Sequence, residues 1–336
     1  MGQEVKIALG GMFAAPARLV VCLLVLAFLP QGAHALDKHG EPGTHTLAIA
    51  VNGSQRTYIV HVPAGYRAQT PAPVVIMLHG GGGSARAALW ETGWAAKADK
   101  EDFLAVFPNA MARDPARPGS FAGNPRLWND GSDRFYAGQE IPDDVGFIAA
   151  MLDDLSARFA VDARRIFVTG FSNGASMSFR VGAQMADRIA AIAPVAGALW
   201  FDPPMFKHPV SMCYVTGTAD PLNLIEGGVP KLASGAADKV RAKPKPPVRD
   251  SILGWAKALG CPAVAAGTSA VNAVRTETYA PCLGGAEVIY IAVDQLGHTW
   301  AGGHSLLPET MVGKTSNKIS ATDVIWEFFR KHPRAP

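Results

Sequence analysis

The chain of 336 residues is 49% apolar and 18% charged, a composition typical of a globular protein and unlike that of low-complexity disorder. Its formal net charge is only +3 and the two signs are interspersed, which argues against a nucleic-acid-binding protein with its basic face. Beyond the N-terminal region no apolar run reaches the ~20 residues of a membrane span, so a polytopic membrane protein is excluded.

The first 35 residues have the layout of a secretory signal peptide. Basic residues precede an apolar run from Leu19 to Leu29, and Ala33 and Ala35 form a small-x-small cleavage site. An uncleaved N-terminal anchor is the alternative. We therefore expect a mature chain that begins near Leu36, is secreted or periplasmic, and keeps no stable membrane partner.

Apolar runs with strand composition recur along the mature chain. Asn52-Gly53 joins the first two runs as a hairpin, and the later runs are continuous, as in strands that are covered on both faces. The expected strands are Thr46–Val51, Thr57–Val62, Val74–Leu78, Phe103–Phe107, Arg165–Thr169, Ala190–Val195, Ser211–Val215 and Val288–Val293.

Between these runs the apolar period becomes helical. Apolar residues from Val145 to Phe159 step by three and four behind a capping Asp143, and a last helix is expected from about Thr322 to Arg330 with Ser320 as its cap. A third apolar stripe runs from Val248 to Leu259. Alternating strands and helices predict a three-layer α/β fold with a mainly parallel sheet covered on both faces. We expect residues 36–336 to form one domain with two long insertions, Asn109 to Pro142 and Leu199 to Pro209.

Gly170 to Gly174 spells the only GxSxG in the chain, with Ser172 at its centre. A strand pattern precedes it and a helical pattern, Ala175 to Met185, follows it. That setting predicts a nucleophile elbow, in which the serine hydroxyl is exposed at a tight turn.

A serine nucleophile needs a base and an acid, which follow it in the chain in this fold. His298 lies just past the strand Val288–Val293, and Asp220 follows the strand Ser211–Val215, so both are expected at the carboxyl edge of the sheet. His304 is the alternative base. Glu226 and Asp250 are the alternative acids.

The glycine run Gly80 to Gly83, behind His79, follows the strand Val74–Leu78. It lacks the Lys-Ser or Lys-Thr of a phosphate-binding loop, so an oxyanion hole is the better interpretation. One donor is then the N–H of Gly81 or Gly82, and the other is the N–H of Asn173. His79 is expected to shape the loop rather than to react.

Cysteine usage fits export. Cys261 and Cys282 lie in loop-like sequence and would close a loop of about 20 residues, worth roughly 3 kcal/mol. Cys213 lies in an apolar strand and is expected to be a buried thiol. No CxxC or HExxH occurs, so neither a metal site nor a cofactor is expected.

Together these motifs resemble the secreted polyhydroxybutyrate depolymerase and feruloyl esterase group of the α/β-hydrolase superfamily, from about Thr57 to Phe329. The resemblance rests on the runs His79–Ala85, Asp143–Phe147, Gly170–Gly174, Ala193–Gly197, Gly217–Asp220 and Gly297–Trp300. It implies a carboxylic ester hydrolase in which Ser172, Asp220 and His298 are nucleophile, acid and base. It also supports the Cys261–Cys282 bridge. Ala301 stands where the family usually has proline, and no cysteine lies near Trp128-Asn129-Asp130, so the substrate loop differs from the family pattern.

The expected substrates are small or oligomeric esters, either short hydroxyalkanoate oligomers or feruloyl and other aryl esters. Trp128, Tyr136 and Trp300 are the candidate substrate contacts, since aromatic residues gather in the insertions and near the base. A serine peptidase of the prolyl-oligopeptidase type and an inactive secreted binding protein on the same scaffold are the alternative functions.

Overall fold

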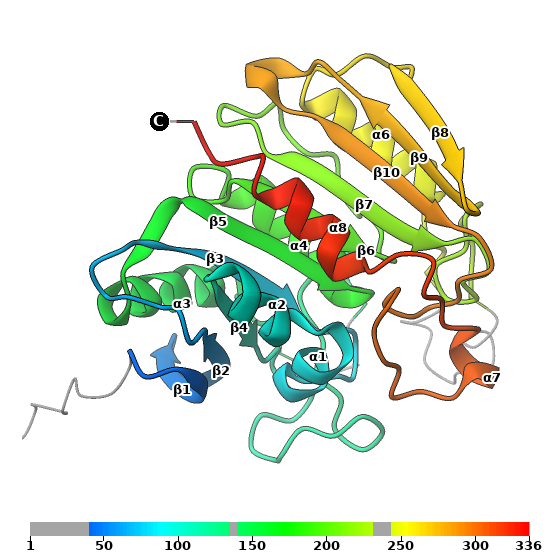
Figure 1. Ribbon diagram of the computed structural model, residues 1–336. Helices are drawn as coiled ribbons and strands as arrows, with labels where there is room; N and C mark the ends of the chain where they lie inside the picture. Colours follow the sequence, from blue (N-terminus) through cyan, green and yellow to red (C-terminus); the bar gives the residue numbers. More distant parts are fainter. Residues whose placement is uncertain (1–39, 135–139, 231–242, 336) are drawn as a thin grey trace, which may run out of the picture. The chain divides into compact units, whose positions relative to one another are not determined.

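Ten strands form one sheet in the computed structural model, which describes residues 40–134, 140–230 and 243–335 (Figure 1). Their order across the sheet is β1-β2-β4-β3-β5-β6-β7-β10-β9-β8. The bounds are β1 Gly43–Val51, β2 Ser54–Val62, β3 Ala72–Leu78, β4 Leu104–Pro108, β5 Val161–Phe171, β6 Ala191–Val195, β7 Ser211–Gly217, β8 Gly267–Val271, β9 Val274–Tyr279 and β10 Val288–Val293.

The centre of the sheet is parallel and both margins are antiparallel. Neighbouring strands from β4 to β10 pair in parallel, whereas β1, β2, β8 and β9 pair antiparallel with their neighbours. The parallel centre places the carboxyl ends of β3, β5, β7 and β10 at one edge. Ligands of open α/β sheets bind at that edge.

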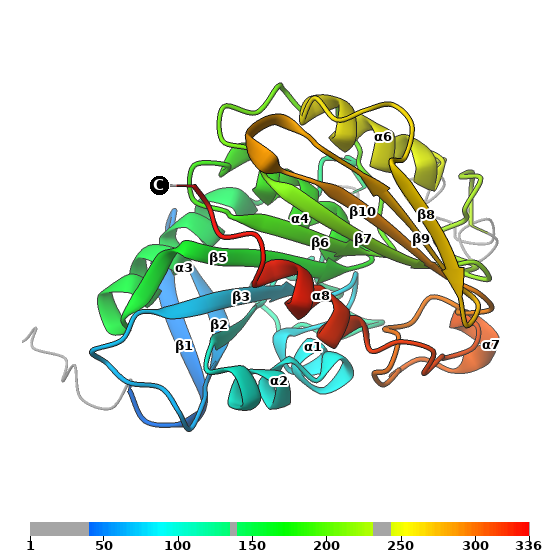
Figure 2. The ribbon, with the colours of Figure 1, turned by 45° about the horizontal axis from the view of Figure 1, so that its top comes forward.

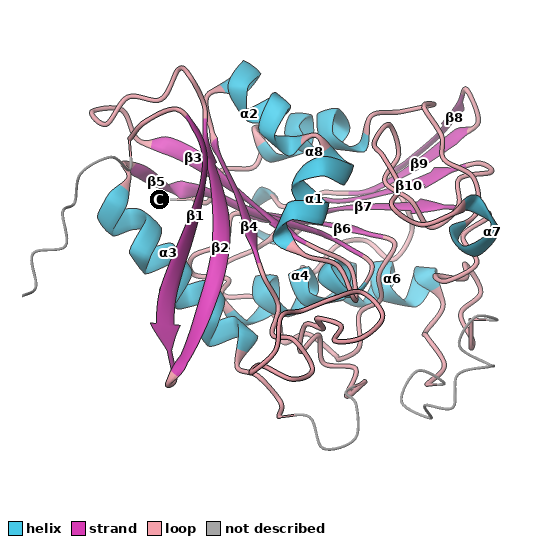
Figure 3. Cartoon of the chain, turned by 90° about the horizontal axis from the view of Figure 1, so that it is seen from below, coloured by secondary structure: helices cyan, strands magenta, loops and turns pink. Residues whose placement is uncertain are grey.

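Helices cover both faces of the sheet, which makes three layers (Figure 3). The helices are α1 Ala85–Thr92, α2 Trp94–Glu101, α3 Asp144–Arg158, α4 Asn173–Gln184, α6 Val248–Ala258, α7 Glu309–Val312 and α8 Ala321–Phe329. The helices α1, α2 and α8 pack on one face, and α3, α4 and α6 pack on the other (Figures 2 and 3).

Alternation along β3 shows how the sequence builds these layers. Val74, Ile76 and Leu78 belong to the core under α3, α4 and α6, while Val75 and Met77 belong to the core under α1, α2 and α8. All of these side chains are fully buried or nearly so. Burying an aliphatic side chain of this kind stabilises the fold by roughly 1.5–3 kcal/mol, so both layers depend on the continuous apolar run.

The α/β fold class is confirmed, as are the eight expected strands, the hairpin and the four expected helical segments, which correspond to α3, α4, α6 and α8. Asp143 accepts the Gly146 N–H at 2.9 Å as the cap of α3, and Ser320 accepts the Asp323 N–H at 3.2 Å as the cap of α8. The helices α1, α2 and α7 and the strands β8 and β9 were not expected from the sequence.

Residues Lys38–Pro336 form one compact unit. The signal peptide expected over residues 1–35 lies outside the described residues and stays a prediction. Within the described ranges, no helix combines the length and the apolarity that crossing a bilayer would take.

Candidate active site

Ser172 lies in a strained turn between β5 and α4. Its backbone has φ 55° and ψ −116°, a conformation that a non-glycine residue adopts only where the surrounding structure enforces it. The turn is tight because Gly170 and Gly174 have no side chains. A Cβ on Gly170 would lie 2.2 Å from Gly174 O, and one on Gly174 would lie 2.2 Å from Leu78 O. This is the geometry expected of a nucleophile elbow.

His298 and Asp220 are in direct contact beneath the protein surface. His298 Nδ1 lies 2.7 Å from Asp220 Oδ2, and both side chains are buried. The other oxygen, Asp220 Oδ1, accepts the main-chain N–H groups of Leu222 and Asn223, both at 2.7 Å. The carboxylate therefore has partners on both oxygens and is fixed in direction.

The pKa of Asp220 lies below its ordinary value. Burial alone would raise the pKa, but the His298 imidazole and the two main-chain donors favour the ionised form more strongly. The Asp220 side chain is therefore a carboxylate at neutral pH. In that form it holds a proton on His298 Nδ1, which leaves Nε2 free to act as a base.

Neighbouring strands bring Asp220 and His298 together. Asp220 follows β7 and His298 follows β10, and these strands pair in parallel from Met212 and Val288 to Gly217 and Val293. The two loops touch closely, since a Cβ on Gly217 would lie 2.0 Å from Leu296 O.

The turn at Ser172 lies close to His298. The Phe171 ring, next to Ser172 in the chain, lies 4.7 Å from the His298 ring, centroid to centroid. A cavity of about 40 Å³ is bounded by Gly80, Phe171, His298 and Trp300, together with residues of α1 and of the segment 304–312.

The glycine loop lies against the elbow. A Cβ on Gly80 would lie 3.5 Å from Ser172 Cβ, and one on Gly81 would lie 3.6 Å from Asn173 Cβ. The Gly82 N–H is already used, because it donates to Arg126 O at 2.7 Å. The Gly81 N–H donates to no acceptor among the described residues. Of the two expected donors, Gly81 is therefore the one left available.

His79 shapes this loop from the interior. Its Nδ1 lies 2.7 Å from Gly80 O, and its Nε2 accepts the Ala110 N–H at 3.1 Å. Burial lowers the pKa of His79 to about 4. The ring is therefore neutral, with its proton on Nδ1.

Asn173 joins the elbow to the first insertion, a role that the sequence did not reveal. Its Oδ1 accepts the Trp128 N–H at 2.8 Å, and its Nδ2 donates to Asp130 Oδ2 at 2.7 Å. Asp130 in turn pairs with Arg134 at 3.1 Å. The Trp128-Asn129-Asp130 stretch is thereby held beside the main-chain N–H of Asn173.

The three residues expected to contact the substrate do not share one environment. Trp128 is only 1% exposed and donates its indole N–H to His79 O at 2.9 Å, so it supports the glycine loop from inside. Trp300 is 2% exposed and donates to Thr322 Oγ1 at 2.9 Å, but it also lines the cavity beside His298. Tyr136 lies outside the described residues.

The alternative acids and base lie elsewhere. Glu226 and Asp250 are exposed, and no hydrogen bond joins either of them to His298 among the described residues. The His304 ring stacks on Trp90 with centroids 4.7 Å apart. Among the described residues, no group of three or more His, Cys, Asp or Glu side chains is arranged to hold a metal ion.

The buried ion pair between Arg56 and Asp144 helps to hold the first insertion in place. Asp144, at the start of α3, pairs with Arg56 at 2.7 Å and accepts the Asn129 N–H at 2.7 Å. Burial raises the pKa of Asp144 above its ordinary value, although Arg56 acts against that shift. Arg180 of α4 donates to Asn129 O at 2.7 Å. The first insertion is therefore tied through Asn129 to two helices, α3 and α4.

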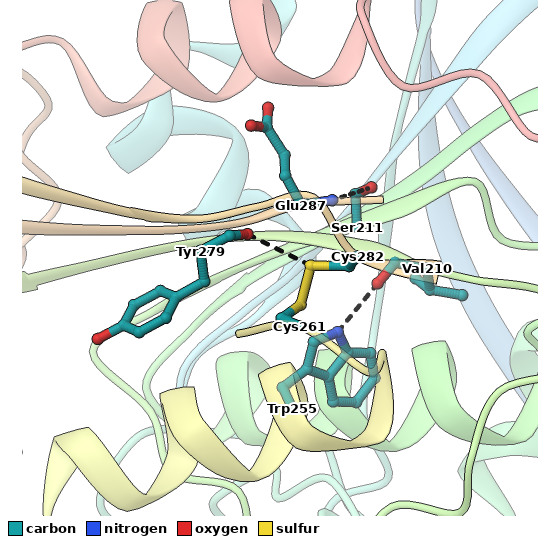
Figure 4. The surroundings of a disulfide bond; sticks show 7 residues. All are labelled: Val210, Ser211, Trp255, Cys261, Tyr279, Cys282 and Glu287. Atoms are coloured by element: carbon teal, nitrogen blue, oxygen red, sulfur yellow. Dashed lines mark hydrogen bonds between the residues drawn. A yellow bond between two sulfur atoms is a disulfide. The ribbon is translucent and has the colours of Figure 1, made fainter. Parts of the chain in front are cut away.

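Cys261 and Cys282 are joined by a disulfide at the amino ends of β7 and β10 (Figure 4). Nearby, Trp255 donates its indole N–H to Val210 O at 2.9 Å. Cys213, the remaining cysteine of the described residues, is buried and has a free thiol.

Similarity to known proteins agrees with this geometry. A family model described as Phospholipase/Carboxylesterase matches residues 65–221. The chain is 27% identical over 304 residues to feruloyl esterase C of Emericella nidulans, covering 90% of this chain and 94% of that protein. It is 30% identical over 186 residues to poly(3-hydroxyalkanoate) depolymerase C of Paucimonas lemoignei, covering 55% of this chain and only 38% of that protein.

The fold is also that of a solved esterase. The acetyl xylan esterase from Aspergillus awamori superposes with a TM-score of 0.52 at 14% identity, covering 76% of this chain and 94% of that one. The expected resemblance is confirmed. The chain has the α/β-hydrolase fold, and its sequence is similar to carboxylic ester hydrolases that include feruloyl esterases and a poly(3-hydroxyalkanoate) depolymerase.

Proposed function

We propose that the protein is a secreted serine esterase that uses Ser172, His298 and Asp220 as its catalytic triad. The buried contact of 2.7 Å between His298 and Asp220, beside an elbow with φ 55° at Ser172, carries the proposal. Such strain persists only where the structure enforces it, and it occurs mainly at functional sites. An imidazole fixed by a carboxylate is the base that a serine hydroxyl needs.

In the first step the Ser172 oxygen attacks the ester carbonyl while His298 Nε2 takes the hydroxyl proton. The new oxyanion accepts hydrogen bonds from the main-chain N–H groups of Asn173 and Gly81. Asn173 is the first residue of α4, where the free N–H groups of the helix N-terminus favour negative charge, and Gly81 lies beside it in the loop after β3. The C–O bond to the alcohol then breaks, and His298 returns the proton to the leaving oxygen, which leaves an acyl-enzyme.

In the second step His298 takes a proton from water, and the resulting hydroxide attacks the acyl carbon. The bond to the Ser172 oxygen breaks, and the serine recovers its proton from His298. Asp220 stays ionised throughout and stabilises the imidazolium that forms in each step. Each oxyanion donor of this kind commonly contributes ~10²–10³ in rate.

The substrates proposed are soluble carboxylic esters, either short hydroxyalkanoate oligomers or feruloyl and other aryl esters. Support comes from the relatives named feruloyl esterase and depolymerase. The alignment with the depolymerase covers 38% of that protein, so activity on the polymer itself is not carried over to this chain. Secretion is proposed from the signal-like sequence before Leu36.

A fluorophosphonate probe followed by a substrate panel tests the proposal. The probe should label Ser172 stoichiometrically, and the Ser172→Ala variant should remain unlabelled. The panel contains p-nitrophenyl esters of increasing acyl length, methyl ferulate, hydroxybutyrate oligomers and peptide amides. Ester turnover without amide turnover is the expected result.

Three outcomes would each overturn a part of the proposal. Turnover of peptide amides in preference to esters would identify a peptidase. Absence of labelling and of ester turnover in a folded protein would identify a binding protein on a hydrolase scaffold. Tight adsorption to crystalline polymer granules, followed by their clearing, would overturn the assignment to soluble esters.

A further inference from the structure

Lys245 is a buried cation beside the proposed acid. The residue is 9% exposed and lies between β7 and α6 in the chain. Its ammonium has three hydrogens to donate, and its single hydrogen bond among the described residues is a long one, 3.4 Å to Asn223 Oδ1. In that same part of the chain it forms no ion pair with a carboxylate.

Such an arrangement costs folding free energy. An ammonium that leaves water loses its hydration, and an incomplete set of hydrogen bonds does not replace it. The cost also appears in the titration of the group, because burial lowers the pKa of Lys245 to about 8. An apolar side chain of the same length would avoid this cost, so the fold alone gives no reason for a lysine here.

The hydrogen bonds of Lys245 lead to the acid. Asn223 accepts from Lys245 through Oδ1, donates from Nδ2 to Tyr214 Oη at 3.0 Å, and donates its main-chain N–H to Asp220 Oδ1 at 2.7 Å. Tyr214 in turn donates to Gly197 O at 2.6 Å. Lys245 therefore donates to the side chain of Asn223, the residue whose main-chain N–H orients the carboxylate.

The field of the ammonium reaches both carboxylates that organise the site. Asp220 and Asp130 act on Lys245 by attraction, and Arg134 acts on it by repulsion. Asp130 holds the side chain of Asn173, while Asp220 holds His298. Asp130 already pairs with Arg134 and Asp220 with His298, so neither of these two carboxylates is paired with Lys245.

We propose that Lys245 is a positioning residue for the triad: through Asn223 and its own charge it keeps Asp220 ionised and aimed at His298, at a cost to stability. This inference rests on the proposed esterase function and names a residue that acts through the acid. Lys245 is not placed in contact with the substrate.

The test compares Lys245→Met, Lys245→Arg and a control, Lys257→Met, which removes an exposed lysine of α6. Lys245→Met should unfold at the same or higher denaturant concentration than the wild type at pH 7. Its kcat on a p-nitrophenyl ester should fall about tenfold or more, with KM little changed, because the acid is no longer aimed. Lys245→Arg should recover part of kcat, and Lys257→Met should match the wild type.

Two pH profiles separate positioning from a purely structural role. The acid limb of kcat/KM should move up by about 0.5 pH unit in Lys245→Met, because removing a nearby cation favours protonation of the base. Lys245→Arg, which keeps the charge, should leave the acid limb in place. The unfolding free energy of the wild type should rise from pH 8 towards 10, since the unfolded chain holds this proton more tightly, and that rise should be absent in Lys245→Met.

The proposal is overturned if Lys245→Met is less stable than the wild type or fails to fold, because added stability is what it predicts. Wild-type kcat and an unmoved acid limb in a folded Lys245→Met would overturn it as well. Loss of activity in Ser172→Ala together with wild-type behaviour of Lys245→Met would refute this inference alone. Retained activity in Ser172→Ala would refute the esterase function itself.

Discussion

The strands β7 and β10 have a different chemistry at each end. Their amino ends carry the Cys261–Cys282 disulfide and two nearby hydrogen bonds (Figure 4). The Trp255 indole N–H donates to Val210 O at 2.9 Å, and the Glu287 N–H donates to Ser211 Oγ at 3.3 Å. At their carboxyl ends lie the buried Asp220 and His298. We call these the disulfide end and the catalytic end.

The two ends differ in what they contribute. The disulfide end is covalently closed and hydrogen-bonded, and it contains no strained backbone at Cys261 or Cys282. The catalytic end adjoins a serine with positive φ and a buried lysine without an ion pair among the described residues. The disulfide thus constrains one end of the strands, while the strained serine and the buried lysine, both of which cost folding free energy, lie near the other.

The largest expected effect is at the catalytic end. Ser172→Ala should lower kcat by at least ~10⁴, because the variant lacks the proposed nucleophile and keeps the proposed oxyanion donors. Steady-state turnover of a p-nitrophenyl ester measures it. The melting temperature should not fall, since alanine makes no new contact. Wild-type turnover by this variant would contradict the assignment.

Opening the disulfide should affect stability alone. The double variant Cys261→Ser, Cys282→Ser should lose about 3 kcal/mol of unfolding free energy, measured by denaturant titration, because the unfolded chain gains freedom. The kcat of the folded fraction should stay within about twofold of the wild type. A fall in kcat of tenfold or more in a fully folded sample would show that the two ends are coupled.

His79 should make the catalytic end sensitive to acid. Its pKa of about 4 in the folded protein is below the ordinary 6.5, so the unfolded state binds more protons between these values. Stability should therefore fall as pH decreases through this window, by about 2 kcal/mol from His79 between pH 7.5 and 5. Denaturant titrations at both pH values measure the fall. In His79→Asn the unfolding free energy should differ less between the two pH values. An unchanged difference would show that other groups cause the acid sensitivity.

The smallest effect is expected at Cys213, in β7 between the two ends. Burial raises the pKa of this thiol to about 12, so the reactive thiolate is scarce at pH 8. Native protein should not react with iodoacetamide at that pH, whereas protein unfolded in urea should react fully. Mass spectrometry measures the modification. Rapid labelling of the native protein would show that β7 opens locally.

The sequence predicted best where one physical signal dominates. The continuous apolar runs of β3 to β7 and β10 identify buried parallel strands, and the two glycines around Ser172 identify the elbow. The positions of Asp220 and His298 follow from the rule that parallel strands share a carboxyl edge. Their contact of 2.7 Å agrees with that placement.

Other features depend on tertiary contacts that no local pattern encodes. All five residues of β8 are exposed, so the strand has no apolar alternation to reveal it. Trp128 was expected to face the substrate, but its indole N–H finds an acceptor in His79 O inside the protein. The Lys245–Asn223 and Asn173–Asp130 contacts join residues that are far apart in the sequence, so no local pattern predicts them.

The shared register of β7 and β10 has a consequence for how this protein can vary. Side chains alternate across a strand, so deleting one residue between Val288 and Val293 would turn everything beyond the deletion to the opposite side. The exposed hairpin of β8 and β9 carries no such restriction, since its outer strand contributes no buried side chain. Natural insertions and deletions should therefore accumulate in that hairpin, while the lengths of the two inner strands stay constant among descendants of this chain.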